Sequence, residues 1–370
     1  MDKLNTVTLS AGGHDFAGWK SVSIGAGLER QARDFNLGIT WRWPGSGDVP
    51  VRIRQGEAVE LRIGQDLLLT GYVFSTPIRY DSETITLSIT GRSRTADLVD
   101  CAAVNQPGQW RGQSVQKIIA AIAGEYGIAV VNDAAVTLGV EDHTIEPGET
   151  AFESIDRLLT LSRLFSTDDG RGRLVIASPG SAGRAVDTLE LGKNLLSGET
   201  NLDFSNVFSE YVSKGQRSGT DDSFGAEATE VEGRITDARI TRRRVKIIQQ
   251  SGQMNASIAR ERVEWERASA VGKALTVNYV IQGWRQSNGA LWRHNMIVRV
   301  VDPLIGFDRD MLISEISYEL SEQGGTTAKI SVAPPEAFLP EPNDAYEKRK
   351  LKKGKATDNF EYLIPADYKP

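Results

Sequence analysis

The residues best able to bind a metal ion or move a proton are three widely separated histidines. His14, His143 and His294 lie in three different regions of the chain. A metal site or a proton relay built on one element needs such side chains a few residues apart, and this spacing does not supply them. We therefore interpret the three histidines as single, polar surface residues.

Two neighbouring carboxylates and one thiol are the other candidates for chemistry. Asp168 and Asp169 could act as a catalytic pair, but Gly170 follows them, and Asp close before Gly is typical of a turn. We favour the turn and keep the catalytic pair as the alternative. The single cysteine, Cys101, can form no internal disulfide and has no second thiol for a Cys-based metal site, so we expect it to be a buried, small hydrophobic residue.

Known phosphate-binding and nucleophile motifs are absent from the sequence. Residues 25–30 (GAGLER) begin like a dinucleotide-binding loop but lack its third glycine and the surrounding βαβ unit. Neither a Walker-type loop nor a Gly-x-Ser-x-Gly elbow occurs. We expect no catalytic residue, cofactor, metal ion or small-molecule substrate, and we predict that the protein is not an enzyme.

A tryptophan-containing hairpin is the most distinctive local feature. Residues 271–338 hold short runs of β-branched residues separated by Gly, Pro or Asp, which predicts a β-meander of four or five strands. The turn at Asn288-Gly289 is typical of type I′. The residues around this turn that we single out are Gly283, Trp284, Trp292 and Asn295. We expect the two tryptophans to pair across the strands in the core, and an exposed position at a subunit contact remains the alternative.

Length and composition restrict the class of protein. The 370 residues suggest two or three domains, at roughly 150 residues each. A content of 40% hydrophobic residues with 36 glycines is typical of a soluble, turn-rich β protein. No run approaches the roughly 18 apolar residues of a membrane helix, and residues 1–9 show no secretory signal, so we expect synthesis and assembly in a cytoplasm. The net charge of −6 argues against a protein that coats nucleic acid.

The hydrophobic patterns divide the chain into four parts. We predict a mainly β protein with a small α/β insert and two β-barrel domains. The four predicted parts are a first barrel at residues 1–100, the α/β insert at 101–185, a second barrel with one helix at 186–338, and an extended tail at 339–370.

The predicted insert contains two capped helices. Ser114 is a suitable N-cap for a helix that ends near Tyr126, where Gly127 can adopt the left-handed closing conformation. Thr150 and Glu153 have the spacing of a capping box, and helical periodicity continues from there to Phe165. Residues 173–177 then return to a strand.

The second β region includes a helix, a basic run and a long polar loop. We predict a strand at residues 207–214, a loop at 215–233 and a helix at 256–273 capped by Asn255. The run Arg242–Arg243–Arg244 precedes a strand at 245–249. We favour a charged, solvated strand edge for this run, with a phosphate-facing lumen as the alternative.

Three segments of the first β region recur in order and spacing in the second. Residues 59–63, 66–73 and 84–90 resemble residues 297–301, 310–317 and 326–332. Because β segments often look alike, coincidence remains open beside duplication. Duplication would mean that one fold is used twice in the chain.

The chain resembles the tail baseplate hub proteins of contractile-tailed bacteriophages, in particular the hub proteins of Mu-like phages. These hub proteins are related to the N-terminal regions of type VI secretion spikes. The resemblance covers roughly residues 1–340. The segments that carry it are residues 71–73, 91–93, 97–100, 149–164, 172–176, 283–295, 310–313 and 325–327.

The resemblance implies a structural virion protein of the tail baseplate. It implies a homotrimeric ring of two related barrels per chain, which joins a sixfold tail tube to a threefold spike. It also implies a central channel through which DNA passes without sequence-specific binding, and Arg242–Arg244 are candidates to line that channel. The partners would be the tail tube and spike proteins, with assembly in the host cytoplasm. We further expect residues 360–364 of the tail to contact a neighbouring tail protein.

Two other functions remain open from the sequence. The order of helices and strands in the insert is similar to that of modules that bind bacterial cell wall glycans, so a cell-wall-binding or cell-wall-degrading tail protein is the main alternative. A β fold with exposed tryptophans would also suit a binder of host surface carbohydrate.

Overall fold

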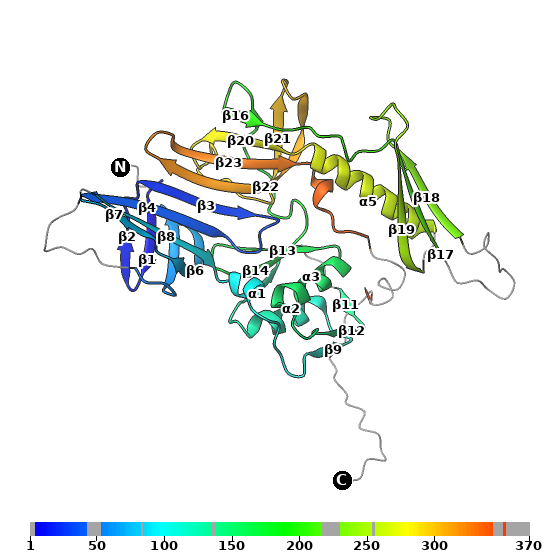
Figure 1. Ribbon diagram of the computed structural model, residues 1–370, viewed down its shortest axis with the longest axis horizontal. Coiled ribbons are helices and arrows are strands. Elements are labelled where there is room, and N and C mark those ends of the chain that lie inside the picture. Colours follow the sequence, from blue (N-terminus) through cyan, green and yellow to red (C-terminus); the bar gives the residue numbers. More distant parts are fainter. Residues whose placement is uncertain are drawn as a thin grey trace, which may run out of the picture.

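The computed structural model describes residues 4–42, 53–82, 84–134, 138–216, 230–253, 256–342 and 351–352 (Figure 1). The protein is mainly β, as predicted. Most of its strands belong to one 14-stranded sheet, in which strands from both ends of the chain lie side by side. None of the helices described is long and apolar enough to cross a membrane.

The first β region supplies eight strands of this sheet. They are β1 (Val7–Ala11), β2 (His14–Phe16), β3 (Ser21–Gly27), β4 (Asp34–Arg42), β5 (Ala58–Ile63), β6 (Asp66–Ser75), β7 (Ile78–Tyr80) and β8 (Thr84–Ser93). Alternation of buried and exposed positions along β1 and β5 shows why these segments form strands with one face in the core. The short strands β2 and β7 were not predicted, since three residues carry too little periodicity.

The second β region supplies the remaining strands of the sheet. They are β15 (Leu189–Glu190), β16 (Leu195–Glu199), β20 (Val277–Gln282), β21 (Ile297–Asp302), β22 (Phe307–Ser321) and β23 (Gly325–Ala333). Strands β21, β22 and β23 form a meander, so the predicted meander of four or five strands is confirmed for these three. Strand β20 pairs with β23 instead of with β21.

Strand β22 fuses the two β regions. Its residues 307–312 pair with β21, and its residues 315–320 pair with β3 of the first region. Since Leu312 pairs with both β21 and β23, and residues 315–320 pair with both β23 and β3, β21 and β3 must follow one another along the same edge of β22. Because this edge of β22 pairs with strands of both β regions, it joins the two regions and is not free to close a separate barrel.

The prediction of two closed barrels is therefore corrected. The described residues form one open, continuous sheet, with β16 and β2 at the ends of its main path. One hydrophobic core serves both regions, and it includes Leu9 and Leu61 from the first with Ile281 and Trp292 from the second. In Figure 1, β20, β22 and β23 lie above β3 and β4.

The sequence echo corresponds to a repeated arrangement of strands. Strands β5, β6 and β8 form an antiparallel meander, and so do β21, β22 and β23. The two meanders lie in the two halves of the one sheet.

The insert has its own hydrophobic core and lies below the sheet in Figure 1. Its elements are α1 (Ala96–Asp100), β9 (Gln109–Arg111), α2 (Val115–Gly124), β10 (Val130–Asn132), β11 (Gly139–Val140), β12 (Asp142–Thr144), α3 (Ala151–Leu161), β13 (Phe165–Asp168) and β14 (Leu174–Ala177). Strands β10, β14 and β13 form a small mixed sheet.

Both predicted helix caps are confirmed. The Ser114 side chain accepts a hydrogen bond from the backbone of Lys117, and Gly127 has a φ of +65° just beyond α2. Thr150 and Glu153 form a complete capping box at α3. Phe165 was wrongly assigned to the helical pattern, since the chain turns at Arg163, with a φ of +57°, and Phe165 begins β13.

A three-stranded sheet and a long helix extend from the second β region. The strands of this sheet are β17 (Glu210–Gln216), β18 (Glu230–Thr236) and β19 (Val245–Gln253), and the helix is α5 (Ala256–Ala274). Two short elements follow later in the chain. They are the 3₁₀ turn η1 (Pro335–Phe338) and the strand β24 (Leu351–Lys352), which pairs with β11 of the insert. The predicted helix and the predicted strands at 207–214 and 245–249 are confirmed in outline by α5, β17 and β19. Strand β18 was not predicted, and its residues 230–233 were wrongly assigned to the loop. Residues 217–229, Asn255 and most of the tail, including 360–364, lie outside the described residues.

Candidate functional site at the junction of three chain regions

The hairpin predicted from Asn288-Gly289 exists, but its turn is of another type. The backbone nitrogen of Gln286 donates to the Ala290 oxygen at 2.8 Å, and that of Gly289 donates to the Gln286 oxygen at 2.9 Å. Gly289 has a φ of +83°, whereas Asn288 is not among the residues with positive φ. A three-residue loop with one left-handed glycine replaces the type I′ turn, and the Asn288 side chain accepts a bond from the Ala290 nitrogen within it.

Both tryptophans of the hairpin are core residues. Trp284 and Trp292 are each 1% exposed, and the Trp292 nitrogen donates to the Trp284 oxygen at 3.1 Å. The Trp284 indole donates to the Thr327 oxygen at 2.9 Å and meets the Tyr318 ring edge-on at 6.4 Å. Core packing is confirmed, and the alternative of exposed tryptophans at a subunit contact is wrong. An exposed tryptophan platform for carbohydrate is excluded at these two positions for the same reason.

Gly283 and Asn295 lie at the two ends of the hairpin segment, residues 283–295, which we call the junction hairpin. Gly283 has a φ of +77° and donates to the Thr326 oxygen at 2.9 Å. Asn295 has a φ of +62°, a conformation that Asn tolerates better than most residues. Its side chain accepts from the Gly180 nitrogen at 2.8 Å and donates to the Ser178 oxygen at 3.0 Å. It thereby fastens the segment that leaves the insert.

Arg285 connects the junction hairpin to the first β region. Its guanidinium donates to the Asp66 carboxylate at 2.7 Å, to the Leu4 oxygen at 2.8 Å and to the Ile63 oxygen at 3.1 Å. Only 14% of the Arg285 side chain is exposed. A guanidinium carries five N–H donors in a fixed plane, so one side chain can hold several acceptors at once.

Gln286 and Ser287 connect the same hairpin to the segment between the insert and the second β region. The Gln286 side chain accepts from the Val186 nitrogen, and the Ser287 nitrogen donates to the Asp187 carboxylate, each at 2.7 Å. The junction hairpin therefore contacts the first β region, the linker and its own sheet.

A buried carboxylate fixes the insert to the first β region. Asp168, at the end of β13, is 2% exposed. Its Oδ1 accepts from Arg33 Nε at 3.0 Å, and its Oδ2 accepts from the Arg33 backbone nitrogen at 3.1 Å. The hydroxyls of Ser93 and Thr95 also donate to Oδ2. Burial raises the pKa of Asp168, and the Arg33 charge and the Ser93 hydrogen bond oppose that rise.

His294 extends this polar cluster to the junction hairpin. Its Nε2 lies 2.9 Å from the Thr167 hydroxyl of β13, and the side chain is buried. Burial, followed by the charges of Arg33 and Arg293, lowers the pKa of His294 to about 3. The neutral imidazole thus lies between the insert and the second β region. We call Arg33, Ser93, Thr95, Thr167, Asp168 and His294 the junction cluster.

The structure corrects the predictions made for several single residues. His143 and His294 are 6% and 7% exposed, so only His14 fits the surface interpretation. Asp168 is a buried strand residue, while the turn begins at Asp169, whose carboxylate accepts from the Arg173 backbone nitrogen. Cys101 is half-buried and has a free thiol.

The junction cluster joins three chain regions through hydrogen bonds between side chains. Ser93 donates to Asp168, and the hydrogen-bond partner of His294 Nε2 is Thr167, so no serine is paired with the imidazole as with a general base. The Arg33 side chain is 14% exposed, and the other members are buried. Among the residues that the structure describes, no three His, Cys, Asp or Glu side chains converge on a metal-sized site.

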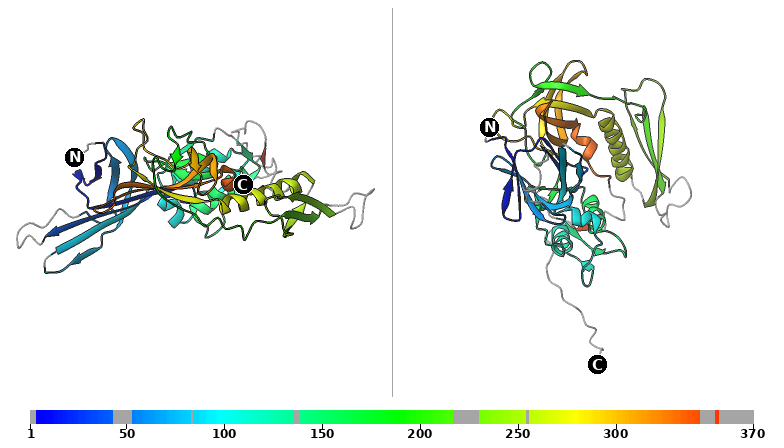
Figure 2. Two further views of the ribbon diagram at one scale, coloured as in Figure 1. Left: turned by 90° about the horizontal axis from the view of Figure 1, so that it is seen from above. Right: turned by 60° about the vertical axis from the view of Figure 1, so that its left-hand side comes forward.

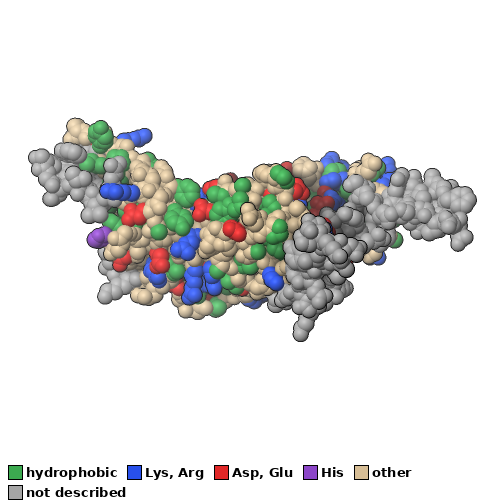
Figure 3. All heavy atoms as spheres, turned by 90° about the horizontal axis from the view of Figure 1, so that it is seen from below, with side chains coloured by type: hydrophobic (Ala, Val, Ile, Leu, Met, Phe, Trp, Pro, Cys, Tyr) green, Lys and Arg blue, Asp and Glu red, His purple; other side chains and the backbone are tan. Residues whose placement is uncertain are grey.

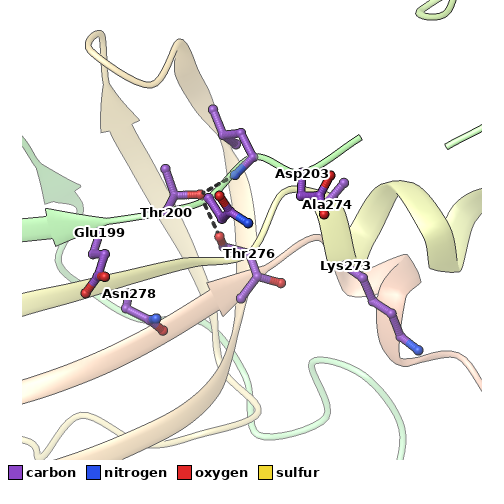
Figure 4. A pocket seen from close by; sticks show the side chains of 9 residues that line it. Glu199, Thr200, Asp203, Lys273, Ala274, Thr276 and Asn278 are labelled. Carbon is purple, nitrogen blue, oxygen red and sulfur yellow. Dashed lines mark hydrogen bonds between the residues drawn. The ribbon is translucent and has the colours of Figure 1, made fainter. Parts of the chain in front are cut away.

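An open groove of about 510 Å³ beside the start of β20 offers no stronger site (Figure 4). The Thr200 hydroxyl donates to the Thr276 oxygen at 2.9 Å, which joins the two walls. Glu199 and Asn278 come from paired strands, and Lys273 points away from them. These side chains do not converge on a common point.

The three arginines of the basic run, Arg242–Arg244, have different environments. Arg242 and Arg243 are exposed, whereas the Arg244 guanidinium lies 4.8 Å from the centre of the Phe208 ring and donates to the Phe204 oxygen. The face in Figure 3 carries basic and acidic side chains interspersed, so no single-sign surface extends across it.

Three family models match the chain in succession. Residues 6–93 match the N-terminal domain of the Mu phage baseplate assembly protein GpP-like family. Residues 95–178 match the second domain of the baseplate hub protein gp44-like family, and residues 255–341 match the fourth domain of the Mu phage baseplate assembly protein GpP.

Individual relatives agree with these matches. The chain is 32% identical to the baseplate hub protein gp44 of Escherichia phage Mu over 350 residues, which are 90% of this chain and 89% of that protein. The crystal structure of the prophage MuSo2 43 kDa tail protein from Shewanella oneidensis is 31% identical, with a TM-score of 0.81 over 91% of this chain and 100% of that one.

More distant structures share the fold. A tail protein from Neisseria meningitidis is 22% identical, with a TM-score of 0.74 over 90% of this chain and 98% of that one. A component of the E. coli type VI secretion system is 11% identical, with a TM-score of 0.54 over 90% of this chain and 79% of that one. Since the identity to the phage Mu protein extends along nearly the whole of both chains, this chain belongs to the baseplate hub proteins of Mu-like contractile phage tails.

Proposed function

We propose that three copies of this chain form a ring that joins a sixfold tail tube to a threefold spike in the baseplate. The work of the ring is geometric, and no substrate is turned over. A ring of identical chains is the closed form of a heterologous contact, in which each copy offers a different surface to each neighbour.

The observation that carries the proposal is the repeated meander. Strands β5, β6 and β8 in the first half of the sheet have the same antiparallel order as β21, β22 and β23 in the second half. Three chains that each carry two such units would present six similar units around one axis. A sixfold tail tube could then bind one face of the ring, although the ring contains only three chains.

The second part of the proposal is that the halves keep a fixed angle. Arg285 and Asp66 link them at 2.7 Å, and β22 pairs directly with β3. Gly283, Trp284, Trp292 and Asn295 would serve this purpose as the structural motif of the junction hairpin. A rigid chain supports approximate sixfold symmetry because neither half can reorient independently.

A central channel for DNA is the third part of the proposal. DNA would pass through without sequence-specific binding, since phosphate contacts position nucleic acid but do not read its bases. The exposed Arg242 and Arg243 are the candidates to face it. Assembly would take place in the host cytoplasm, with the tail tube and spike proteins as partners.

Solution mass measurement combined with particle imaging tests the ring. The expected result is a species of three chains whose projections show a ring with pseudo-sixfold features. A protein that stays monomeric at every concentration, alone and with its tail tube and spike partners, would overturn the proposal.

The proposed role of the tail needs its own experiment. Residues 360–364 (FEYLI) combine aromatic and aliphatic side chains next to a basic run, which suits a contact with a neighbouring tail protein. Removal of residues 341–370 should impair baseplate assembly while the ring still forms. Unchanged assembly would count against the contact.

A further inference from the structure

The outer ends of β4, β7 and β8 carry the apolar face of the main sheet beyond the core. Leu37 of β4 pairs with Ile89 of β8, and these residues are 0% and 8% exposed. Two residues further out, Ile39 pairs with Leu87, and Leu87 pairs with Ile78 of β7. Because directly paired residues and every second residue share a face, all five side chains lie on the core face of the sheet.

The core residues that cover this face do not extend to the outer ends of the strands. Ile78 is 40% exposed, and Tyr80, which pairs with Ile85, is 75% exposed. Residues 39–42, 78–80 and 84–87 form what we call the arm. The blue strands that contain it project away from the helices in the left view of Figure 2. No other described element pairs with the free edge of β7.

A second uncovered edge lies at β16, which is one end of the main path of the same sheet. Strand β16 pairs with β20, and apart from one bridge between Leu195 and Leu191 it has no second neighbour among the described strands. Leu196 of β16 is 56% exposed. Seven strand-to-strand steps separate β16 from β7 in the order of the sheet. The two surfaces therefore lie in separate places on one chain, with β16 at the top and β7 at the left of Figure 1.

The two edges are also complementary in charge. Arg79 of β7 and Glu199 of β16 are exposed, and neither forms an ion pair with another described residue. Arg79 pairs with Thr86 on the face opposite to Ile78 and Tyr80, and Glu199 pairs with the exposed Asn278. Each edge thus offers an apolar side chain together with one charge, of opposite sign.

We propose that the arm of one copy, through Ile78 and Tyr80, docks against the β16 edge of the next copy around the ring, with Arg79 opposite Glu199. Contact between two different surfaces of the same chain is heterologous and closes into a ring when the rotation permits. This inference rests on the proposed trimer and assigns its subunit contact. It also uses two exposed sheet edges that would otherwise favour indiscriminate pairing.

Disulfide cross-linking tests the contact directly. In a Cys101→Ala background, the double variant Tyr80→Cys, Leu196→Cys should give covalent dimers and trimers under mild oxidation with copper phenanthroline. Either single variant should give far less of both products. The matched control is the double variant Tyr80→Cys, Leu304→Cys. Leu304 is 84% exposed in the turn between β21 and β22, and this variant should give no covalent dimers or trimers.

A charge exchange provides an independent readout of the same contact. Arg79→Glu and Glu199→Arg should each raise the trimer dissociation constant by about tenfold, and the double exchange should recover most of the loss. If the wild-type chain is a trimer but the cysteine variant does not cross-link and the charge variants do not change the trimer dissociation constant, the docking is overturned and the ring stays intact. A wild-type chain that forms no trimer with or without its partners overturns the ring itself.

Discussion

Arg33 donates to Asp168 across the boundary between the first β region and the insert, with 3.0 Å between Nε and Oδ1. The exposed fractions are 14% for the Arg33 side chain and 1% for that of Asp168. Charges this deeply buried have lost their hydration, so each depends on the other for compensation. Docking of the insert should therefore be sensitive to substitution at this pair.

Replacement of Asp168 by alanine should strongly destabilise the protein. The change leaves the Arg33 charge without its partner and removes the acceptor of Ser93 and Thr95. Breaking a buried pair from one side costs about 3–5 kcal/mol of unfolding free energy. Denaturant unfolding at a fixed protein concentration measures the loss.

Asp308→Ala is the matched control for this experiment. Asp308 forms an ion pair with Arg299 at 2.6 Å, but 72% of its side chain is exposed. An exposed pair contributes less than about 1 kcal/mol, so the control should be nearly neutral. Equal losses in the two variants would show that burial does not govern the Asp168 pair.

Stability should depend on pH through His294. Burial lowers the pKa of His294 to about 3, whereas its ordinary value is 6.5. Between these values the unfolded chain binds a proton that the folded chain does not, so the unfolding free energy falls as the pH falls. The slope for one such proton is at most about 1.4 kcal/mol per pH unit.

Asp168 acts in the opposite direction. Burial raises the pKa of Asp168, so the folded chain holds a proton there at pH values just above 3.8 while the unfolded chain does not. The contribution of Asp168 to stability therefore increases as the pH falls through that range. The comparison of wild type with His294→Gln separates the two effects, because only the histidine term disappears.

The pH experiment needs unfolding curves at several pH values between about 4 and 6.5, a range that lies inside the window set by the values of about 3 and 6.5. His294→Gln should flatten the dependence, and the exposed His14→Gln should leave it unchanged. If His294→Gln keeps the wild-type slope, protonation of His294 does not limit the stability in acid.

Local features of the fold were predictable from the sequence because their signals are local. The Ser114 cap and the Thr150–Glu153 capping box each involve residues a few positions apart. Likewise, alternation of apolar and polar residues revealed most of the longer strands. The family resemblance, now established by the relatives, also depended on contiguous segments.

The assembly of these elements was not predictable from such patterns. The pairing of β22 with β3 joins residues almost 300 positions apart, as in Glu315 with Gly27, and no periodicity specifies it. The acceptor of Arg33 lies 135 residues away, and the Asp-Asp-Gly sequence favoured a turn over a buried charge. Arg33, Ser93, Thr95 and Arg285 were missed as junction residues for this reason.

Replacement of Arg285 should loosen the two halves of the sheet relative to each other. Arg285→Ala removes its bonds to Leu4, Ile63 and Asp66. Of these residues only Ile63 is buried, while Leu4 and Asp66 are accessible to water. We expect a loss of about 1–3 kcal/mol in unfolding free energy, mostly from the one buried acceptor. Limited proteolysis should also become faster near Asp66.

Arg285→Lys distinguishes geometry from charge. A lysine keeps the positive charge but cannot hold several coplanar acceptors, so it should recover less than half of the loss. Arg299→Ala is the control, because Arg299 is 41% exposed and its acidic partners are exposed too. Full recovery by lysine would assign the effect to charge alone.

Asn295 combines an unusual backbone conformation with a side-chain network, and glycine and alanine separate the two. Its φ of +62° is accessible to glycine without strain, so Asn295→Gly loses only the bonds to Ser178, Gly180 and Ser181. Asn295→Ala loses the bonds and is also strained, and should be less stable than Asn295→Gly by about 1 kcal/mol.

Arg163 supplies the matched control for Asn295. It has a similar φ of +57° but is exposed, and its side chain forms no hydrogen bond or ion pair with another described residue. Arg163→Gly should therefore be neutral or stabilising by up to about 1 kcal/mol, because only backbone strain changes. A stabilised Asn295→Gly would mean that the Asn295 side chain does not hold the segment leaving the insert, since relief of strain would then outweigh its three hydrogen bonds.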